Sequence, residues 1–168
     1  MRSTALIIGV YKVAMSARDD LPAQRSGRVA IYHPPGAMGL GRNPFGKDVA
    51  NLALWRAVAR HGGYEHVDVL TLRPTSAEAL AAALFEGDGP RPQLAWGLLQ
   101  GSRAPRAAGV LLRGQPYLAD LAWMRRRQAA DRGYSLVGWI HTLAPPAIRQ
   151  FIADCAAAPT QAWDALVC

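Results

Sequence analysis

The stretch from residue 28 to residue 72 constrains the fold more than any other part of this chain. It begins with a β-branched run at 28–32, which the prolines at 34–35 end. A glycine-rich loop and a helical segment follow, and then a strand-like segment at 67–72 that alternates apolar and polar residues as far as residue 70. A strand, a helix and a strand of these lengths predict a right-handed parallel crossover, because that connection packs the helix back onto the sheet.

The helix of this unit has sequence signals at both ends. Asn43 followed by Pro44 is typical of an N-cap with proline at the first helical position. Arg60 and His61 precede the glycine pair at 62–63, which is where the helix dipole favours positive charge and where glycine ends a helix. The helix is therefore predicted to begin directly after Asn43 and to end at His61.

Beyond residue 72 the sequence alternates between helical and strand-like segments. Thr75 and Glu78 form a capping-box pattern at the first of these helices. Residues 93–100 are read as either a short strand or an irregular segment, and 101–106 as a loop. The other predicted elements are helices at 77–85, 118–132 and 147–158, and strands at 107–112, 135–140 and 165–168. This alternation predicts an α/β fold with a Rossmann-like parallel sheet and helices on both faces.

The predicted helix at 118–132 combines an apolar face with a basic run. The residues expected to face the core are Leu121, Ala122, Met124 and Ala129. The three arginines at 125–127 are interpreted as a solvated face near the end of the helix, with contact to anionic lipid or nucleic acid as the alternative.

The length of 168 residues and a hydrophobic content of 51% predict one folded domain. We assign that domain to residues 28–168 and treat residues 1–27 as an N-terminal extension. Within the extension, 5–10 is either an extra edge strand or the core of a weak signal peptide. The last predicted strand ends with the sequence, whereas a parallel strand is normally followed by a helix that covers it, so we expect a domain truncated at its C-terminal end.

The net charge of +7 indicates anionic partners. No nucleic-acid-binding motif accompanies the charge, so we expect no nucleic-acid partner. An anionic nucleotide and an anionic membrane surface both fit, which keeps a peripheral membrane contact open. Cys155 and Cys168 form neither a disulfide framework nor a zinc site, and they indicate a reducing, cytoplasmic location.

The glycine-rich loop resembles two phosphate-binding motifs without completing either. Residues 41–47 match the P-loop spacing, but Asp48 follows where a hydroxyl should reach magnesium, and Pro44 removes an N–H from the cradle. A dinucleotide fingerprint would place its third glycine at Pro44 and an acidic residue after the second strand, where Arg73 stands. Neither motif is predicted to operate in its usual form.

A looser interpretation of the same loop remains. Its amides and the following helix N-terminus are suited to a diphosphate, with a lysine in the first turn. The residues of this predicted donor-phosphate loop are Gly39, Gly41, Asn43, Gly46 and Lys47. The structural alternative is that the glycines only make a tight turn.

Polar side chains follow three of the predicted strands. His33 comes after the first strand, Arg113 and Gln115 after the strand at 107–112, and His141 and Thr142 after the strand at 135–140. The carboxyl ends of parallel strands share one edge, where ligands bind in open α/β sheets, so we expect these residues to line a common site.

Three segments and the chain end carry a resemblance to a known family. They are Asn-Pro-Phe-Gly-Lys-Asp-Val-Ala-Asn at 43–51, Leu-Arg-Gly-Gln-Pro-Tyr-Leu at 112–118, Tyr-Ser-Leu-Val-Gly-Trp-Ile-His-Thr at 134–142, and Trp-Asp-Ala-Leu-Val-Cys at 163–168. In this order they resemble the N-terminal half of bacterial glycosyltransferases of the large GT4 group, which have the GT-B fold. The resemblance covers residues 28–168.

The resemblance implies the acceptor-side domain of a two-domain enzyme whose active site lies between the domains. Such an enzyme transfers a sugar from a nucleotide-sugar, its substrate, to a glycan or other acceptor hydroxyl, and no further cofactor or metal is implied. The glycine loop would face the donor diphosphate, and His141 would act at the cleft. His33, Arg113, Gln115 and Thr142 would contact the acceptor.

The chain departs from the family by lacking the second domain, which carries most donor contacts and the paired glutamates of such retaining enzymes. We therefore expect the isolated chain to be inactive and to need a C-terminal domain or a partner chain. A non-catalytic nucleotide- or glycan-binding domain is the alternative, and a P-loop-like NTPase that depends on Lys47 is a second alternative.

Overall fold

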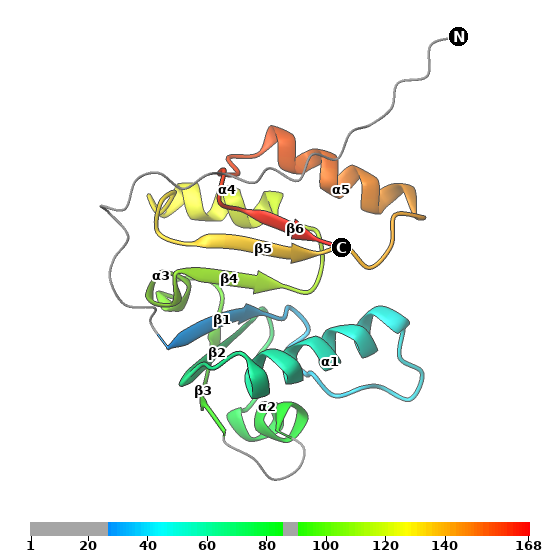
Figure 1. Ribbon diagram of the computed structural model, residues 1–168, viewed down its shortest axis with the longest axis vertical. Coiled ribbons are helices and arrows are strands. Elements are labelled where there is room, and N and C mark those ends of the chain that lie inside the picture. Colours follow the sequence, from blue (N-terminus) through cyan, green and yellow to red (C-terminus); the bar gives the residue numbers. More distant parts are fainter. Residues whose placement is uncertain (1–26, 86–90) are drawn as a thin grey trace.

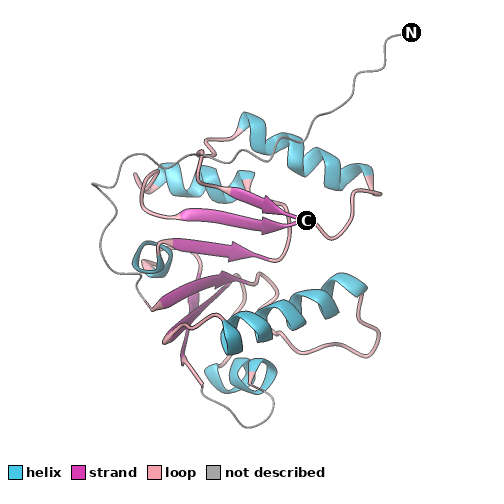
Figure 2. Ribbon diagram, in the orientation of Figure 1, coloured by secondary structure: helices cyan, strands magenta, loops and turns pink. Residues whose placement is uncertain are grey.

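The computed structural model describes residues 27–85 and 91–168. Within these ranges the chain forms one six-stranded sheet in which every strand pairs in parallel with its neighbours, and helices lie on both faces (Figures 1 and 2). The predicted α/β Rossmann-like class is confirmed. The edge strand predicted at 5–10 lies outside the described residues.

The elements follow one another as strand and helix throughout. In chain order they are β1 (Arg28–Tyr32), α1 (Gly46–His61), β2 (His66–Thr71), α2 (Ala77–Leu84), β3 (Gln93–Leu98), α3 (Ala104–Ala108), β4 (Val110–Arg113), α4 (Ala119–Arg127), β5 (Ser135–Trp139), α5 (Pro146–Ala157) and β6 (Ala165–Val167).

The strand order is β3-β2-β1-β4-β5-β6. From β1 the chain adds β2 and β3 on one side. It then returns through α3 and adds β4, β5 and β6 on the other side of β1. The register pairs Tyr32, the last residue of β1, with Arg113, the last residue of β4. In open α/β sheets such a reversal leaves a crevice at the carboxyl ends of the two central strands, so this edge is where a ligand is expected.

Alternate residues of the strands point to opposite faces of the sheet and belong to two separate hydrophobic cores. Val29 and Ile31 face α1 and α2, where Leu52 and Trp55 of α1 are buried against them. Ala30 and Tyr32 face the other side, together with Leu121 and Ala122 of α4. A strand buried on both faces explains why the run at 28–32 is almost continuously apolar.

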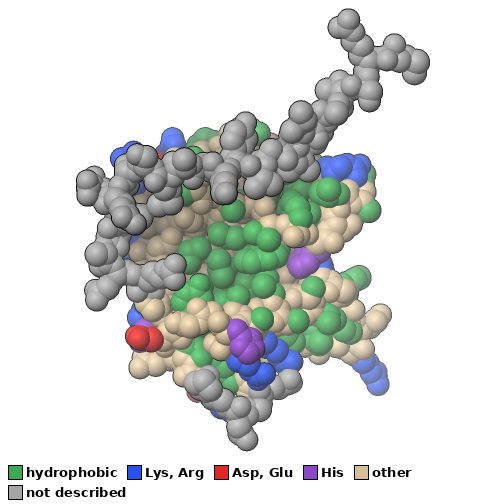
Figure 3. Space-filling view, viewed as in Figure 1, with side chains coloured by type: hydrophobic (Ala, Val, Ile, Leu, Met, Phe, Trp, Pro, Cys, Tyr) green, Lys and Arg blue, Asp and Glu red, His purple; other side chains and the backbone are tan. Residues whose placement is uncertain are grey.

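The two faces are covered unequally. In Figure 1, α1 and α2 lie over the β1–β3 half of the sheet, and no described helix lies over the same face of β6. Hydrophobic side chains gather at the centre of this face in Figure 3. Val137 and Trp139 of β5 are only partly buried, and Val167 of β6 is 39% exposed.

The predicted N-caps of the first two helices need correction. The first helix begins at Gly46, and its N-cap is Phe45 in an extended conformation without a side-chain cap. The carbonyl of Phe45 accepts from the amide of Asp48 at 2.8 Å, which closes the first turn two residues later than predicted. The second helix is capped by Ser76, not Thr75, because the Ser76 hydroxyl accepts from the amide of Ala79.

The segment around residue 105 also differs from the prediction. Residues 104–108 form α3, where a loop and the start of a strand were expected, and the strand β4 begins only at Val110. Gly109 separates them with a φ of 71°, in the left-handed region that favours glycine. Pro105 in the first turn suits a helix start, a signal that the sequence interpretation overlooked.

The helix predicted at 118–132 ends at Arg127. Ala129 has a φ of 49°, which no helix accommodates, and its side chain is exposed instead of facing inward. Ala130 takes the buried position in its place. The predicted inward positions of Leu121 and Ala122 are confirmed.

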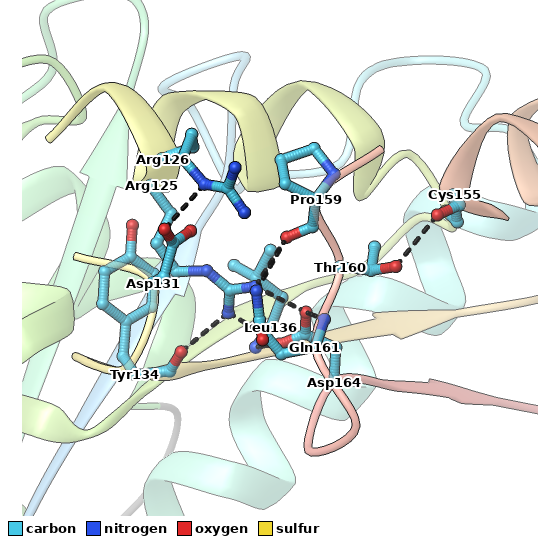
Figure 4. Close-up of polar contacts among 10 residues, drawn as sticks. All are labelled: Arg125, Arg126, Asp131, Tyr134, Leu136, Cys155, Pro159, Thr160, Gln161 and Asp164. Atoms are coloured by element: carbon cyan, nitrogen blue, oxygen red, sulfur yellow. Dashed lines mark hydrogen bonds and ion pairs between the residues drawn. The ribbon is translucent and has the colours of Figure 1, made fainter. Parts of the chain in front are cut away.

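Arg125 overturns the interpretation of 125–127 as a wholly solvated face. Its guanidinium is 0% exposed and donates two bonds to the carboxylate of Asp164, at 2.7 and 2.6 Å (Figure 4). Asp164 also accepts from the amides of Leu136 and Gln161, both at 2.8 Å. This network ties α4 and the start of β5 to the turn before β6.

Among residues 27–85 and 91–168, no helix has the length and apolar composition needed to cross a membrane.

Candidate functional site

The carboxyl edge of the sheet brings together residues that are far apart in sequence. His33 directly follows β1, Arg113 is the last residue of β4, and His141 lies two residues beyond β5. β4 pairs with both β1 and β5, so it lies between the two histidines. The structure thus places these three predicted site residues along one edge of three adjacent strands.

His141 is held at this edge by two other elements. Its Nε2 lies 2.9 Å from Oδ1 of Asn51 on α1 and 2.9 Å from the carbonyl oxygen of Gly114 after β4. A carbonyl oxygen only accepts, so Nε2 carries the hydrogen, and in the neutral ring Nδ1 keeps its lone pair. The residue is exposed, which leaves that nitrogen available to a hydroxyl group.

Asn51 is a site residue that the sequence interpretation missed. Its side chain is 7% exposed, although it lies on the first helix beside the buried Leu52. A Cβ on Gly114 would overlap the Asn51 side chain, with Cγ at 2.5 Å, so the contact between the helix and the end of β4 requires glycine. The sequence did contain a sign of this role, because an asparagine stands at a helix position that the helical periodicity assigns to the core.

Thr142 and Gln115, two further residues predicted to bind the acceptor, have local structural contacts instead. The Thr142 hydroxyl accepts from the amide of Ala144 at 3.2 Å and stabilises the local turn. Gln115 is partly buried after β4, and its carbonyl oxygen would lie 2.9 Å from a Cβ on Gly138. That close approach makes glycine necessary in β5 at this point.

The predicted phosphate loop forms an open surface. Gly39, Gly41 and Gly46 are exposed, none has a positive φ, and a Cβ on any of them would meet nothing within 4 Å. Lys47 is also exposed, with Nζ 5.9 Å from the centre of the Phe45 ring. The glycines are thus not required by the loop's conformation here, and they leave the backbone accessible to a ligand.

Asn43 belongs to the same exposed loop and does not cap the helix. The charges around it are mixed, because the basic Arg42 and Lys47 are followed by Asp48 in the first helical turn. Asp48 opposes an anion at the helix N-terminus, and the two basic residues offset it.

His33 and the loop share a small cavity of about 180 Å³ on the α1 side, which Gly39, Gly41 and Asp48 also line. His33 Nε2 lies 3.0 Å from the carbonyl oxygen of Ala37. Burial lowers the pKa of His33 below its ordinary value of 6.5, and the bond to Ala37 and the charge of Asp48 act in the opposite direction. A neutral His33 therefore supports the loop.

Arg113 points into a different cavity, of about 530 Å³, on the α4 side of the same edge. Its guanidinium carbon lies 5.1 Å from the ring centres of both Tyr32 and Tyr117. One terminal nitrogen donates to the Tyr117 carbonyl at 2.5 Å. The predicted site is therefore divided, with His33 and the glycine loop on one side of the strand ends and Arg113 on the other.

The described ranges contain no group of three histidine, cysteine, aspartate or glutamate side chains placed to hold a metal ion.

Comparison of the chain with family models, with curated proteins and with solved structures finds no match.

Proposed function

We propose that this chain is the acceptor-side domain of a GT-B glycosyltransferase. The enzyme would transfer a sugar from a nucleotide-sugar to an acceptor hydroxyl in a cleft that a C-terminal domain or a partner chain completes. Strand order supports the proposal, because ligands of open α/β sheets bind where the order reverses, and in β3-β2-β1-β4-β5-β6 it reverses between β1 and β4. The resemblance of the segments at 43–51, 112–118 and 134–142 supports it independently.

The anchoring of His141 carries the proposal. Two acceptors, on Asn51 and Gly114, fix its Nε2–H, so Nδ1 is the ring nitrogen left for a ligand. A positioned imidazole nitrogen with a free lone pair is a suitable acceptor for a hydroxyl proton. His141 would orient the acceptor hydroxyl and take its proton as the new glycosidic bond forms.

The glycine loop would receive the donor. Its exposed backbone at Gly39 and Gly41 and the ammonium group of Lys47 would face the diphosphate. The leaving nucleotide diphosphate gains negative charge as the bond to the sugar breaks, so positive charge at this place favours the transition state.

The loop also suits a peripheral membrane contact at the cytoplasmic face. Two apolar side chains of the loop, Leu40 and Phe45, are 45% and 72% exposed, and Val49 in the first turn of α1 is 44% exposed. Arg42 and Lys47 lie among them, and apolar side chains interspersed with basic ones are typical of segments that bind anionic lipid surfaces.

The test is sugar transfer by the complete polypeptide that the source reading frame encodes, supplemented with a separately encoded donor domain if the frame ends at Cys168. A panel of nucleotide-sugars would be assayed for release of nucleoside diphosphate and for product mass. His141→Ala is expected to reduce kcat about 100-fold. His61→Ala, at the far end of α1, is the matched control. Transfer that is equal in both variants would remove His141 from the mechanism.

One observation favours the non-catalytic alternative, a nucleotide- or glycan-binding domain. Among the described residues, His141 hydrogen-bonds an amide and a carbonyl, and no carboxylate. Catalytic histidines that act as bases are commonly paired with a carboxylate that stabilises the imidazolium ion. Saturable nucleotide or glycan binding without transfer, in the presence of the second domain, would support this alternative.

A further inference from the structure

The cavity on the α4 side of the strand ends has a composition unlike that of the glycine loop. Its volume of about 530 Å³ suits a small organic molecule. The lining residues come from the ends of β1 and β4, from the segments that follow β2 and β3, and from one face of α4. The polar ones are Tyr32, Gln100, Arg113, Asp120, Arg127 and Gln128.

Arg113 is the main polar group of this cavity. Tyr32 and Tyr117 lie against its guanidinium, each ring centre at 5.1 Å, and hold the side chain in place. Its Nη1 is used in the bond to Tyr117, whereas its Nε is buried without a partner among the described residues. A fixed guanidinium with a free N–H is a site that an acceptor oxygen would satisfy.

The charges of the cavity are not balanced. Arg113 and Arg127 contribute two positive charges, and Asp120 contributes one negative charge. No ion pair joins Asp120 to either arginine within 4.0 Å in the described part of the chain. Burial lowers the pKa of Arg113, and the nearby Tyr32 and Asp120 act in the opposite direction. An anion would compensate the remaining charge.

Apolar side chains form the rest of the lining. Leu99 and Leu121 are buried at 6% and 2% exposure, and Met124 is partly buried beside them. Leu72, 61% exposed, lies at the rim. A ligand here would place its charged end against Arg113 and an apolar or aromatic body against these residues.

We propose that this cavity binds an organic anion, a carboxylate or phosphate monoester on an apolar or aromatic body, as part of the acceptor. The inference rests on the proposed function. Arg113 and Gly114 are consecutive, and Gly114 holds His141, so the cavity and the histidine flank the end of β4. The acceptor would bind by its anionic group and present a hydroxyl toward His141.

The test is a titration of the chain with benzoate, phenyl phosphate and benzyl alcohol, which share a ring and differ in charge. The Arg113 Nε–H signal and the backbone amides would be followed by NMR. Benzoate or phenyl phosphate is expected to bind with a Kd of roughly 1 mM, because so small a ligand makes few contacts. Benzyl alcohol is expected to bind at least about tenfold more weakly, because it lacks the charge. The two anions distinguish a carboxylate ligand from a phosphate ligand.

Two variants and a matched control complete the experiment. Arg113→Met should weaken anion binding at least about tenfold, and Arg127→Gln at the rim should weaken it about threefold. Arg132→Met, an exposed change of equal charge after α4, should have no effect. Arg113 also packs against two tyrosines, so Arg113→Met could unfold the chain. In that case the proposal is tested by Arg127→Gln and by comparing benzoate with benzyl alcohol on the unmodified chain.

The proposal is overturned if benzyl alcohol binds as tightly as benzoate, if Arg127→Gln and Arg132→Met behave alike, or if neither anion binds at roughly 20 mM. These outcomes are separable from failure of the proposed function, which concerns nucleotide binding at the glycine loop and sugar transfer at His141. Anion binding in the cavity of a chain that never supports transfer would preserve the site and reject the enzyme.

Discussion

The imidazole Nε2 of His141 lies 2.9 Å from Oδ1 of Asn51, although 90 positions separate the two residues in the chain. One is on the first helix and the other follows the fifth strand. Their contact forms only after the parallel sheet has been assembled, so the orientation of His141 depends on the whole fold. We expect Asn51 to act as a positioning residue.

Replacing Asn51 tests that role. Asn51→Ala should lower kcat for sugar transfer by the complete polypeptide about fivefold, because the loss of one hydrogen bond of about 1 kcal/mol leaves the ring less well oriented. Asn51→Asp keeps an acceptor oxygen and should restore most of the loss. The ¹⁵N signals of the His141 ring supply an independent readout, since they report the tautomer and its mobility. An Asn51→Ala protein with normal kcat and unchanged ring signals would show that Gly114 alone positions the histidine.

The buried ion pair predicts a large effect on stability. Arg125→Met leaves the Asp164 carboxylate without its charged partner at 5% exposure and should reduce the free energy of unfolding by about 3–5 kcal/mol. Arg126→Met is the matched control, because the neighbouring pair with Asp131 has the same 2.6 Å distance but side chains 50% and 32% exposed. That change should cost about 0–1 kcal/mol. Urea unfolding measures the loss of stability in each variant. Equal losses would contradict the burial of the pair between Arg125 and Asp164.

The depressed pKa of His33 predicts a pH dependence. Burial disfavours its charged form in the folded chain, while Asp48 and the Ala37 carbonyl partly compensate. The unfolded chain then binds more protons below the ordinary value of 6.5, so stability should fall as the pH is lowered through that range and be constant above it. His33→Gln should make the free energy of unfolding less dependent on pH between 7.5 and 5.5, roughly one unit on either side of the ordinary value. Urea titrations give the free energy of unfolding at the two pH values. If it changes with pH as much in His33→Gln as in the unmodified chain, His33 is not the cause.

The exposed ring of Phe45 predicts lipid binding. Phe45→Ser should weaken binding to vesicles containing phosphatidylserine about tenfold, since a fully buried phenylalanine contributes about 1.5–3 kcal/mol. Serine is a favoured N-cap residue, so the helix start at Gly46 should be retained. Trp123→Ser, which removes a ring 46% exposed on α4, is the control for sedimentation with the vesicles. Equal sedimentation of the two variants would argue against the loop as the contact.

The sequence predicted the architecture well because strands buried on both faces leave continuous apolar runs, as at 28–32, and because glycine and proline mark the connections. The errors concern single residues at element ends. Phe45, not Asn43, is the N-cap, and no side chain bonds the first turn. Ala129 adopts a left-handed conformation, which could not be predicted from an alanine.

The candidate site was predicted only in outline. Strand ends identified His33, Arg113 and His141, since parallel strands share one carboxyl edge. The partners of these residues were missed because they come from distant elements. Arg125 illustrates the same limit, since its spacing from Leu121 and Ala122 places it on the buried face, but its carboxylate partner is 39 positions away.

A donor site at the carboxyl edge of the sheet is tested most directly by mapping where a nucleoside diphosphate binds this chain. Titration of the ¹⁵N-labelled chain with uridine diphosphate and guanosine diphosphate, with uridine as the uncharged control, would follow every amide. We expect saturable shifts at residues 39–47 and at His141, which Lys47→Ala weakens and uridine does not reproduce. Shifts confined to other surfaces, or none at roughly 10 mM ligand, would contradict a donor site at the carboxyl edge of the sheet.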